Sequence, residues 1–178
     1  KMTTENRIPT SFAGNTQPWH RVWKKMSDDA QTDYRVAMDE GGINFKVGKV
    51  QMPHPFADKF EEGKVPQLNN YGLFRLDNYA ELGKCSSEYE VIDNEIAFNF
   101  MEELMDEGLR IDSCGSFQNG AVVFFNVKTY ESEIVPGDPM QHYLQAVTSH
   151  SGRYSLDFFS SGTQIWCSNS LKKAIKDA

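Results

Sequence analysis

The stretch LRIDSCGSFQNGAVVFFNVKTY, residues 109–130, decides the fold of this chain. Asn119 and Gly120 stand at its centre, and both residue types tolerate the positive φ that a tight type I′ turn requires. Runs rich in β-branched and aromatic residues flank this pair on both sides. The sequence therefore predicts a β-hairpin here, and the rest of the chain is organised around it.

The second strand of this hairpin has two different faces, because successive side chains of a strand alternate sides. Val123, Phe125 and Val127 form an apolar face that is typical of a core. The other face, which mixes aromatic rings with an amide and a cation, consists of Phe124, Asn126, Lys128 and Tyr130. One interpretation is a platform for the bases of single-stranded nucleic acid, each stacked base contributing ~1 to 3 kcal/mol. The other is that a second layer of structure covers Phe124.

The composition indicates one soluble domain. A chain of 178 residues with 39% apolar and 12% aromatic content can bury one sizeable core. Residues 1–17 carry Thr, Asn, Gly and Pro without periodicity, which predicts an irregular arm before a single domain over residues 18–178. No run approaches the roughly 18 apolar residues of a membrane span, and the start lacks the apolar core of a signal peptide. We therefore expect a soluble cytoplasmic protein that does not contact a membrane.

The sequence contains no motif for catalysis or metal binding. Cys85, Cys114 and Cys167 are far apart and odd in number, which argues against disulfides or a zinc site and for reduced thiols. The histidines lack metal-ligand spacing, and no phosphate loop, nucleophile elbow or paired-carboxylate motif appears. Cys114 is either a nucleophile or a buried thiol, and the buried thiol is favoured. We expect a protein that is not an enzyme and uses no cofactor or metal.

The net charge of −7 is unevenly distributed along the chain. Residues 85–112 hold nine acids against Arg110 alone, a net of −8, which leaves about +1 for the remainder. A basic face that binds nucleic acid is therefore compatible with the sequence. Four of the acids lie at or near the end of a predicted helix, where the dipole disfavours anions, and form either a solvated edge or a protein-binding surface. These are Glu102, Glu103, Asp106 and Glu107.

Periodicity and turn residues predict an α+β fold. Ser27 is a candidate N-cap for a helix that runs to Gly41, and Asn94 for a helix over residues 95–107. Residues 53–70 hold three prolines and no pattern, which predicts a long loop. A strand is predicted at residues 43–52, with a bulge or bend at Gly48. The other predicted elements are strands at residues 71–76, 88–92, 143–149, 154–160 and 164–167, and a helix at residues 170–177. This order of strands and helices predicts curved antiparallel sheets built from hairpins, with two to three packed helices.

Two basic segments are candidate binding surfaces for nucleic acid. Residues 18–25 interleave Trp19 and Trp23 with cations, and the two rings, four residues apart, either anchor the core or contact bases. The last predicted helix buries Leu171, Ala174 and Ile175 and presents a basic face that is either solvated or bound to phosphates. That face consists of Lys172, Lys173 and Lys176.

Several segments, in a fixed order, resemble a family of phage- and plasmid-encoded proteins of unassigned biochemical function. The matching segments are residues 18–20 (PWH), 41–47 (GGINFKV), 89–98 (YEVIDNEIAF), 114–117 (CGSF) with Gly120, 149–152 (SHSG), and 166–171 (WCSNSL) followed by Ala174. The chain is also similar to the regulators of phages that carry their own RNA polymerases, which bind single-stranded DNA and bring a polymerase to an opened promoter. This resemblance implies a location in the cytoplasm of an infected bacterial cell and a fold without the oligonucleotide-binding barrel.

Two functional hypotheses follow. The first is a non-catalytic, phage-encoded protein that binds single-stranded DNA in transcription regulation or in DNA replication or recombination, and that forms a homo-oligomer. The second is an interaction module that recruits an RNA polymerase or a host factor through its acidic helix. For the first, the predicted DNA-binding residues are Phe124, Lys128, Tyr130, Lys46, Lys49, Arg75, Arg153, Lys172, Lys173 and Lys176.

Overall fold

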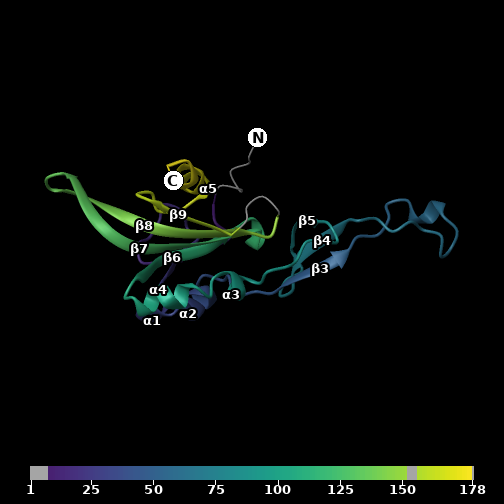
Figure 1. The fold of residues 1–178 in the computed structure, drawn as a ribbon, viewed down its shortest axis with the longest axis horizontal. Helices are drawn as coiled ribbons and strands as arrows, with labels where there is room; N and C mark the ends of the chain where they lie inside the picture. The colour runs from purple at the N-terminus through teal and green to yellow at the C-terminus, as the bar shows by residue number, and fades with distance from the viewer. Residues whose placement is uncertain (1–7, 152–155, 178) are drawn as a thin grey trace.

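The computed structural model describes residues 8–151 and 156–177, which form two β-sheets and five helices (Figure 1). The larger sheet has six strands in the order β2-β1-β6-β7-β8-β9, and the smaller has three in the order β3-β4-β5. Both sheets are open within these residues. The predicted α+β class, without an oligonucleotide-binding barrel, is confirmed.

The large sheet is built around the predicted hairpin. β6 (Arg110–Phe117) and β7 (Val122–Val135) pair antiparallel. β8 and β9 continue this pattern beyond β7, while β1 pairs with β6 antiparallel and with β2 in parallel. These strands are β1 (Ser11–Gly14), β2 (Lys24–Lys25), β8 (Asp138–Ser149) and β9 (Asp157–Ser161).

The turn of the central hairpin is longer than the predicted two-residue type I′ turn. Gln118, Asn119 and Gly120 all have positive φ, at 53°, 59° and 105°, and form a short 3-10 helix. A Cβ on Gly120 would lie 2.6 Å from the Phe45 ring, so both the backbone conformation and the close approach require glycine here. The hairpin is confirmed, and its type I′ turn is wrong.

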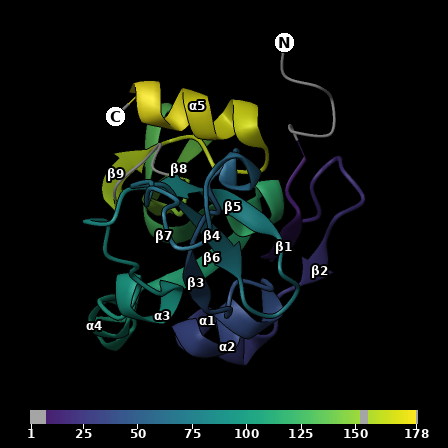
Figure 2. The same cartoon turned by 90° about the vertical axis from the view of Figure 1, so that its right-hand side faces the viewer.

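Helices cover both faces of the large sheet. α1–α4 lie on one face and α5 on the other, as the end view shows (Figure 2). On the first face the ring of Phe98 packs edge-on against Phe125, with centroids 4.7 Å apart. The helices are α1 (Asp28–Thr32), α2 (Tyr34–Glu40), α3 (Asn94–Ala97), α4 (Met101–Asp106) and α5 (Ser168–Asp177).

The small sheet carries a long projecting arm. Its antiparallel strands are β3 (Val47–Gln51), β4 (Tyr71–Arg75) and β5 (Glu81–Cys85). Residues 52–70 leave the end of β3 and return to β4, with only a short 3-10 helix at Ala57–Lys59 (Figure 1). The predicted loop is confirmed. Of the predicted bulge or bend at Gly48, the bulge is wrong, because pairing runs unbroken through this residue and the irregularity lies between Leu73 and Phe74.

The predicted arm and first helix need correction. Ser11–Gly14 is not irregular but forms β1, because its backbone continues the ladder of β6; residues 1–7 lie outside the described part. Ser27 caps α1 as predicted, accepting a hydrogen bond from the Ala30 amide. The helix then breaks at Asp33, whose backbone is extended and whose carboxylate accepts from the amides of Arg35 and Val36. Asp33 thus begins a second helix.

The predicted helix over residues 95–107 is present as two pieces. Hydrogen bonds from the Met101 amide to the Phe98 carbonyl and from Glu102 to Asn99 tighten the chain between α3 and α4 into a 3-10 turn. Asn94 is not the N-cap, because its side chain is buried and donates to the Ile43 carbonyl at 2.9 Å.

Two predicted strands are absent from the described chain at residues 88–92 and 164–167. At the first, Lys49 Nζ donates to the carbonyls of Ser87 and Tyr89 at 2.6 and 2.7 Å, so a side chain replaces a neighbouring strand. The predicted hairpin of β8 and β9 is confirmed, although its turn includes residues 152–155, which lie outside the described residues.

Candidate nucleic-acid interface

The ring of Phe124 lies inside the core between β7 and α5. It is fully buried and stacks on Phe117, with ring centroids 5.2 Å apart. Leu171 and Ala174 of α5 belong to the same buried cluster. The sequence left two alternatives for Phe124, a platform for bases or a ring covered by a second layer. The structure shows the second, with α5 as the covering layer. Its prediction as a base-stacking platform is wrong in this structure, because α5 excludes a nucleotide from its ring.

Lys128 neutralises a carboxylate that is buried in the sheet. Its Nζ lies 2.9 Å from Oδ1 of Asp112, whose side chain is 1% exposed. Gln164 donates to the other oxygen of this carboxylate. Burial, and then the charge of Asp112, raise the pKa of Tyr143 to about 12. A phosphate would have to compete with Asp112 for Lys128, so this lysine is a weak candidate for DNA contact.

Tyr130 stands on a two-stranded ribbon where β7 and β8 project beyond the rest of the sheet (Figure 1). It is 57% exposed, and its ring stacks on His142 with centroids 4.2 Å apart. The Ser132 hydroxyl lies 2.8 Å from Nε2 of His142 and fixes the imidazole. Of the two rings predicted to stack on bases, Tyr130 is the one that reaches the surface.

Two predicted phosphate contacts on the small sheet are engaged within the protein. Lys46 forms ion pairs with Asp93 and Glu95 at 3.3 and 3.4 Å. The hydrogen bond and charge of Asp93, followed by those of Glu95, raise the pKa of Lys46. Lys49 donates to backbone carbonyls, including that of Tyr89, and lies over an aromatic ring. Both lysines therefore have partners within the protein, and neither forms a free cationic patch.

Arg75 is also held internally. Its guanidinium pairs with Asp77 and donates to the Asn119 carbonyl at 3.2 Å, which joins the small sheet to the central turn. It lies 3.9 Å from the centre of the Phe45 ring. The hydrogen bond from Arg75 lowers the pKa of Asp77. Arg153, the other predicted arginine, lies outside the described residues.

α5 carries the predicted basic face at the surface. Leu171 and Ala174 face the sheet and are buried. Ile175, which the sequence predicts to be buried, is 38% exposed. The lysines of the helix are all exposed, and they are Lys172, Lys173 and Lys176.

Residues 18–23 lie beside the start of α5. His20 is buried, and its Nε2 lies 2.9 Å from the Trp166 carbonyl, just before the helix. Trp23 packs against the same core cluster as α5 and donates from Nε1 to the Gly14 carbonyl. Trp19 is 68% exposed. The two tryptophans therefore differ: Trp23 packs on the core, and Trp19 presents an exposed ring next to His20, in the segment that adjoins the start of α5.

The two helical layers carry opposite charge. On the side of α1–α4, residues 26–40 hold five acids and one base, and residues 93–107 hold six acids and no base. On the side of α5, residues 18–23 and 164–177 hold four bases and the single acid Asp177. The charge partition predicted along the sequence thus becomes a partition across the sheet, because α5 and the acidic helices pack on opposite faces.

A group of exposed rings on the arm is missing from the sequence prediction. His54 lies edge-on to Phe60, with centroids 5.1 Å apart, and 6.2 Å from Phe56. Phe56 and Phe60 are 61% and 40% exposed. The sequence does contain a signal for these rings, namely large apolar residues in a segment without periodicity. Such a segment predicts a surface loop, and the side chains of a surface loop are not buried in a core.

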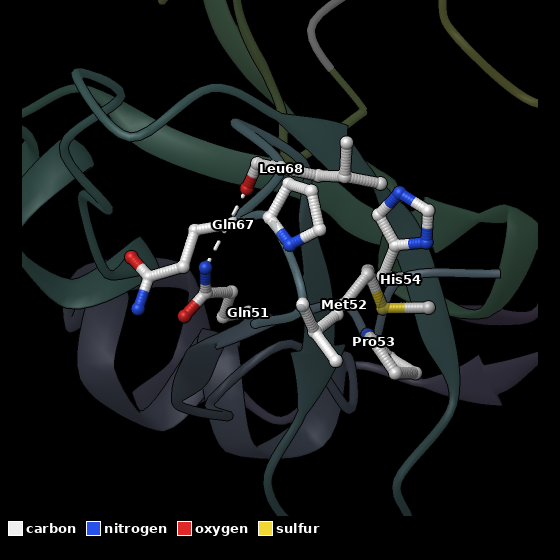
Figure 3. Close-up of a pocket in the computed structure, with 8 residues that line it drawn as sticks. Gln51, Met52, Pro53, His54, Gln67 and Leu68 are labelled. Atoms are coloured by element: carbon white, nitrogen blue, oxygen red, sulfur yellow. Dashed lines mark hydrogen bonds between the residues drawn. The ribbon is translucent and has the colours of Figure 1, made fainter. Parts of the chain in front are cut away.

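A hollow of about 290 Å³ lies at the base of this arm (Figure 3). Gln51 donates to the Leu68 carbonyl at 3.5 Å and links the two limbs of the arm across it. Met52 and Pro53 supply apolar surface, and His54 is the one titratable residue of the lining.

Cys114 is a structural thiol. It is fully buried, and its Sγ donates to the Ala37 carbonyl at 3.1 Å. Burial raises the pKa of this thiol, which disfavours the nucleophilic thiolate. The three cysteines are free, as predicted. Within residues 8–151 and 156–177, no three His, Cys, Asp or Glu side chains form a metal-binding group.

The fold and this interface define an α+β protein with a basic and an acidic helical layer on opposite faces of one sheet. Residues 81–178, more than half of the chain, match the family model described as Domain of unknown function (DUF932). The chain belongs to the DUF932 family, and its predicted membership of a family of unassigned function is confirmed. No curated protein and no solved structure matches it. In the described part of the chain, no helix is long and apolar enough to cross a membrane.

Proposed function

We propose that this protein binds single-stranded DNA, without catalysing a reaction, in transcription regulation or in DNA replication or recombination. The observation that carries the proposal is an exposed tryptophan in the segment that adjoins the start of a basic helix, which lies on the face of the sheet opposite the acidic layer. Phosphates contact Lys172, Lys173 and Lys176, and a base stacks on Trp19. Tyr130 on the projecting ribbon is a second stacking ring. This combination of cations and exposed rings is the usual basis of sequence-tolerant single-strand binding.

The net charge of −7 does not oppose this proposal at physiological ionic strength. The acidic helices and α5 are separated by two layers of packing, each about 10 Å thick. The Debye length is about 8 Å at 0.15 M salt, so the repulsion from the far layer is largely screened at α5. At very low salt the acidic layer directs the DNA toward the α5 face.

The resemblance to phage transcription regulators supports the proposed role in an infected bacterial cell. Homo-oligomer formation and recruitment of an RNA polymerase remain predictions of the same resemblance. Single-strand binding does not depend on either of them.

A titration of the protein with fluorescent oligo-dT, read by anisotropy at 50 and 200 mM salt, tests the proposal. We expect binding at 50 mM, and an affinity whose logarithm falls with the logarithm of salt by about 0.7 for each phosphate contacted. A duplex of equal length should bind more weakly, because its bases cannot stack on Trp19. Absence of binding at 50 mM salt, or an affinity that does not change with salt, would rule the proposal out.

A further inference from the structure

An apolar groove lies open between the acidic helices and the outer strand of the large sheet. Ile96, Phe100 and Leu104 line one wall, and Leu144 and Phe158 line the other. The groove encloses about 510 Å³. Ile96 and Phe158 are 62% and 48% exposed, so both walls leave large apolar side chains in contact with solvent.

The groove lies where the α3–α4 segment passes the outer strand of the sheet. β9 is the last strand, and its Phe158 pairs with Ala146 on the side that faces the helices. The rings of Phe100 and Phe158 pack edge-on with centroids 4.5 Å apart, so the two walls meet there at the bottom of the groove. In Figure 2, α4 and β9 both lie at the left of the view.

Helical spacing predicts an acidic rim for the groove. Glu103 and Glu107 are exposed and lie three residues after Phe100 and Leu104, so they share a side of α4 with this wall. Glu102 is paired with Arg35 at 3.3 Å, whereas Glu103 and Glu107 form no ion pair with a cation in the described part of the chain. These two carboxylates are therefore available to an external cation.

We infer that this groove docks a basic amphipathic helix of another protein. The apolar face of the helix packs on Ile96, Leu104 and Phe158, and its lysines or arginines pair with Glu103 and Glu107. Helix-in-groove recognition has this form, with anchors at i, i+3, i+4 and i+7.

Charge and packing favour a basic helix of another protein over nucleic acid or a second copy of this chain. Nucleic acid is repelled by the acidic rim. The basic amphipathic helix of a second copy is α5, and its Leu171 and Ala174 are already buried against the sheet. The surface is distinct from the α5 face, so this inference goes beyond the proposed function and does not depend on it.

A fluorescent 18-residue peptide of Leu and Lys, with Leu at helical spacing, is the probe. We expect saturable binding that Ile96→Asn weakens by at least about tenfold, since a central apolar anchor contributes more than about 1.4 kcal/mol. The double variant Glu103→Gln/Glu107→Gln should weaken binding several-fold, and more so at low salt. Val50→Asn is the matched control: Val50 is 54% exposed on β3, so its replacement should leave the affinity unchanged.

Three results would overturn the inference: no binding of the Leu/Lys peptide, equal binding of a Leu/Glu peptide with the same spacing, or wild-type affinity in the Ile96→Asn variant. A dimer in sedimentation that Ile96→Asn dissociates would assign the groove to a second copy and also overturn it. If Ile96→Asn does not fold, the double variant Glu103→Gln/Glu107→Gln replaces it as the test, because both residues are exposed. An unchanged affinity of that double variant for the Leu/Lys peptide would then overturn the inference. Oligo-dT affinity should be unaltered by all of these variants, which keeps this test separate from that of DNA binding.

Discussion

At the scale of single residues, buried polar side chains decide how the chain closes over the large sheet. The amide group of Asn126 donates to the Ile165 carbonyl at 3.1 Å, and its oxygen accepts from the Ile165 amide at 3.2 Å. One side chain therefore supplies the two hydrogen bonds that a neighbouring strand would give. For this reason residues 164–167 cross the face of the sheet and do not form the strand that their sequence predicts.

Phe124→Ala should lower the free energy of unfolding by about 3 to 5 kcal/mol, because it leaves a cavity under α5. Urea denaturation measures this loss, and oligo-dT affinity of the folded fraction should be unchanged. Tyr130→Ala is the comparison: it should cost less than about 1.5 kcal/mol of stability, the contribution of one aromatic pair, and about 1 to 3 kcal/mol of DNA binding. A Phe124→Ala variant with normal stability and weakened DNA binding would contradict the assignment.

Lys128→Ala should destabilise the protein, because it leaves the buried charge of Asp112 without a cation. Loss of one partner of a fully buried pair costs about 3 to 5 kcal/mol. Lys128 is 44% exposed, so solvent screening reduces our expectation to about 1 to 3 kcal/mol. A double-mutant cycle with Asp112→Asn checks this, since the second change should restore part of the stability. Strictly additive losses would show that the two residues are not coupled.

His150 should make stability depend on pH. Asn94 donates to the Ile43 carbonyl, so its oxygen faces His150 and accepts from Nε2 at 2.8 Å. Burial lowers the pKa of His150 to about 4, against the opposing charge of Asp93. Between about pH 6.5 and 4 the unfolded state binds the extra proton, so stability is complete above this window and falls by about 3 kcal/mol across it as the pH falls.

Urea denaturation at pH 7 and pH 4.5 measures this dependence. His150→Gln, which keeps a donor for Asn94, should be less stable at pH 7 and should lose less stability on acidification than the wild type. An equal loss of stability on acidification in the two proteins would show that His150 does not titrate on unfolding.

At the scale of elements, local signals were predictable and pairing partners were not. The central hairpin, the cap at Ser27, the loop over residues 53–70 and the basic face of α5 depend on neighbouring residues, and all are present. Residues 88–92 have the composition of a strand, but their carbonyls accept from Lys49, which is about 40 residues away. Such a contact has no local signature, and tertiary context therefore overrides β-propensity.

Replacement of residues 53–69 by Asn-Gly should preserve the fold. The Met52 amide donates to the Asn70 carbonyl at 2.9 Å, and Gln51 pairs with Tyr71, so the two ends already have the geometry of a two-residue hairpin. No residue of this segment is buried. Circular dichroism should show cooperative melting within a few degrees of the wild type. Loss of cooperativity would mean that the arm contributes to the core.

At the scale of the whole molecule, the order of layers positions the candidate interface. The α+β class follows from the pattern of elements, but the packing of α5 over Phe124 does not, because it joins segments about 45 residues apart. Likewise, the hydrogen bond that holds residues 18–23 at α5 links His20 to Trp166. The exposure of Trp19 and the partial burial of Trp23 accompany that long-range contact. Of the predicted surfaces, the hairpin face around Phe124 is therefore covered, and the basic face of α5 is exposed.

The central claim is that the α5 face contacts the phosphates of single-stranded DNA. The most direct measurement compares the salt dependence of oligo-dT binding between the wild type and the triple variant Lys172→Ala/Lys173→Ala/Lys176→Ala. The matched control is Lys59→Ala/Lys64→Ala/Lys84→Ala, which changes the net charge equally at exposed positions on the arm and small sheet. We predict that the logarithmic salt slope falls by about 2 in the α5 variant, or about 0.7 for each lost contact, and stays unchanged in the control. An equal slope in the α5 variant and the wild type, with both proteins folded, would contradict the account.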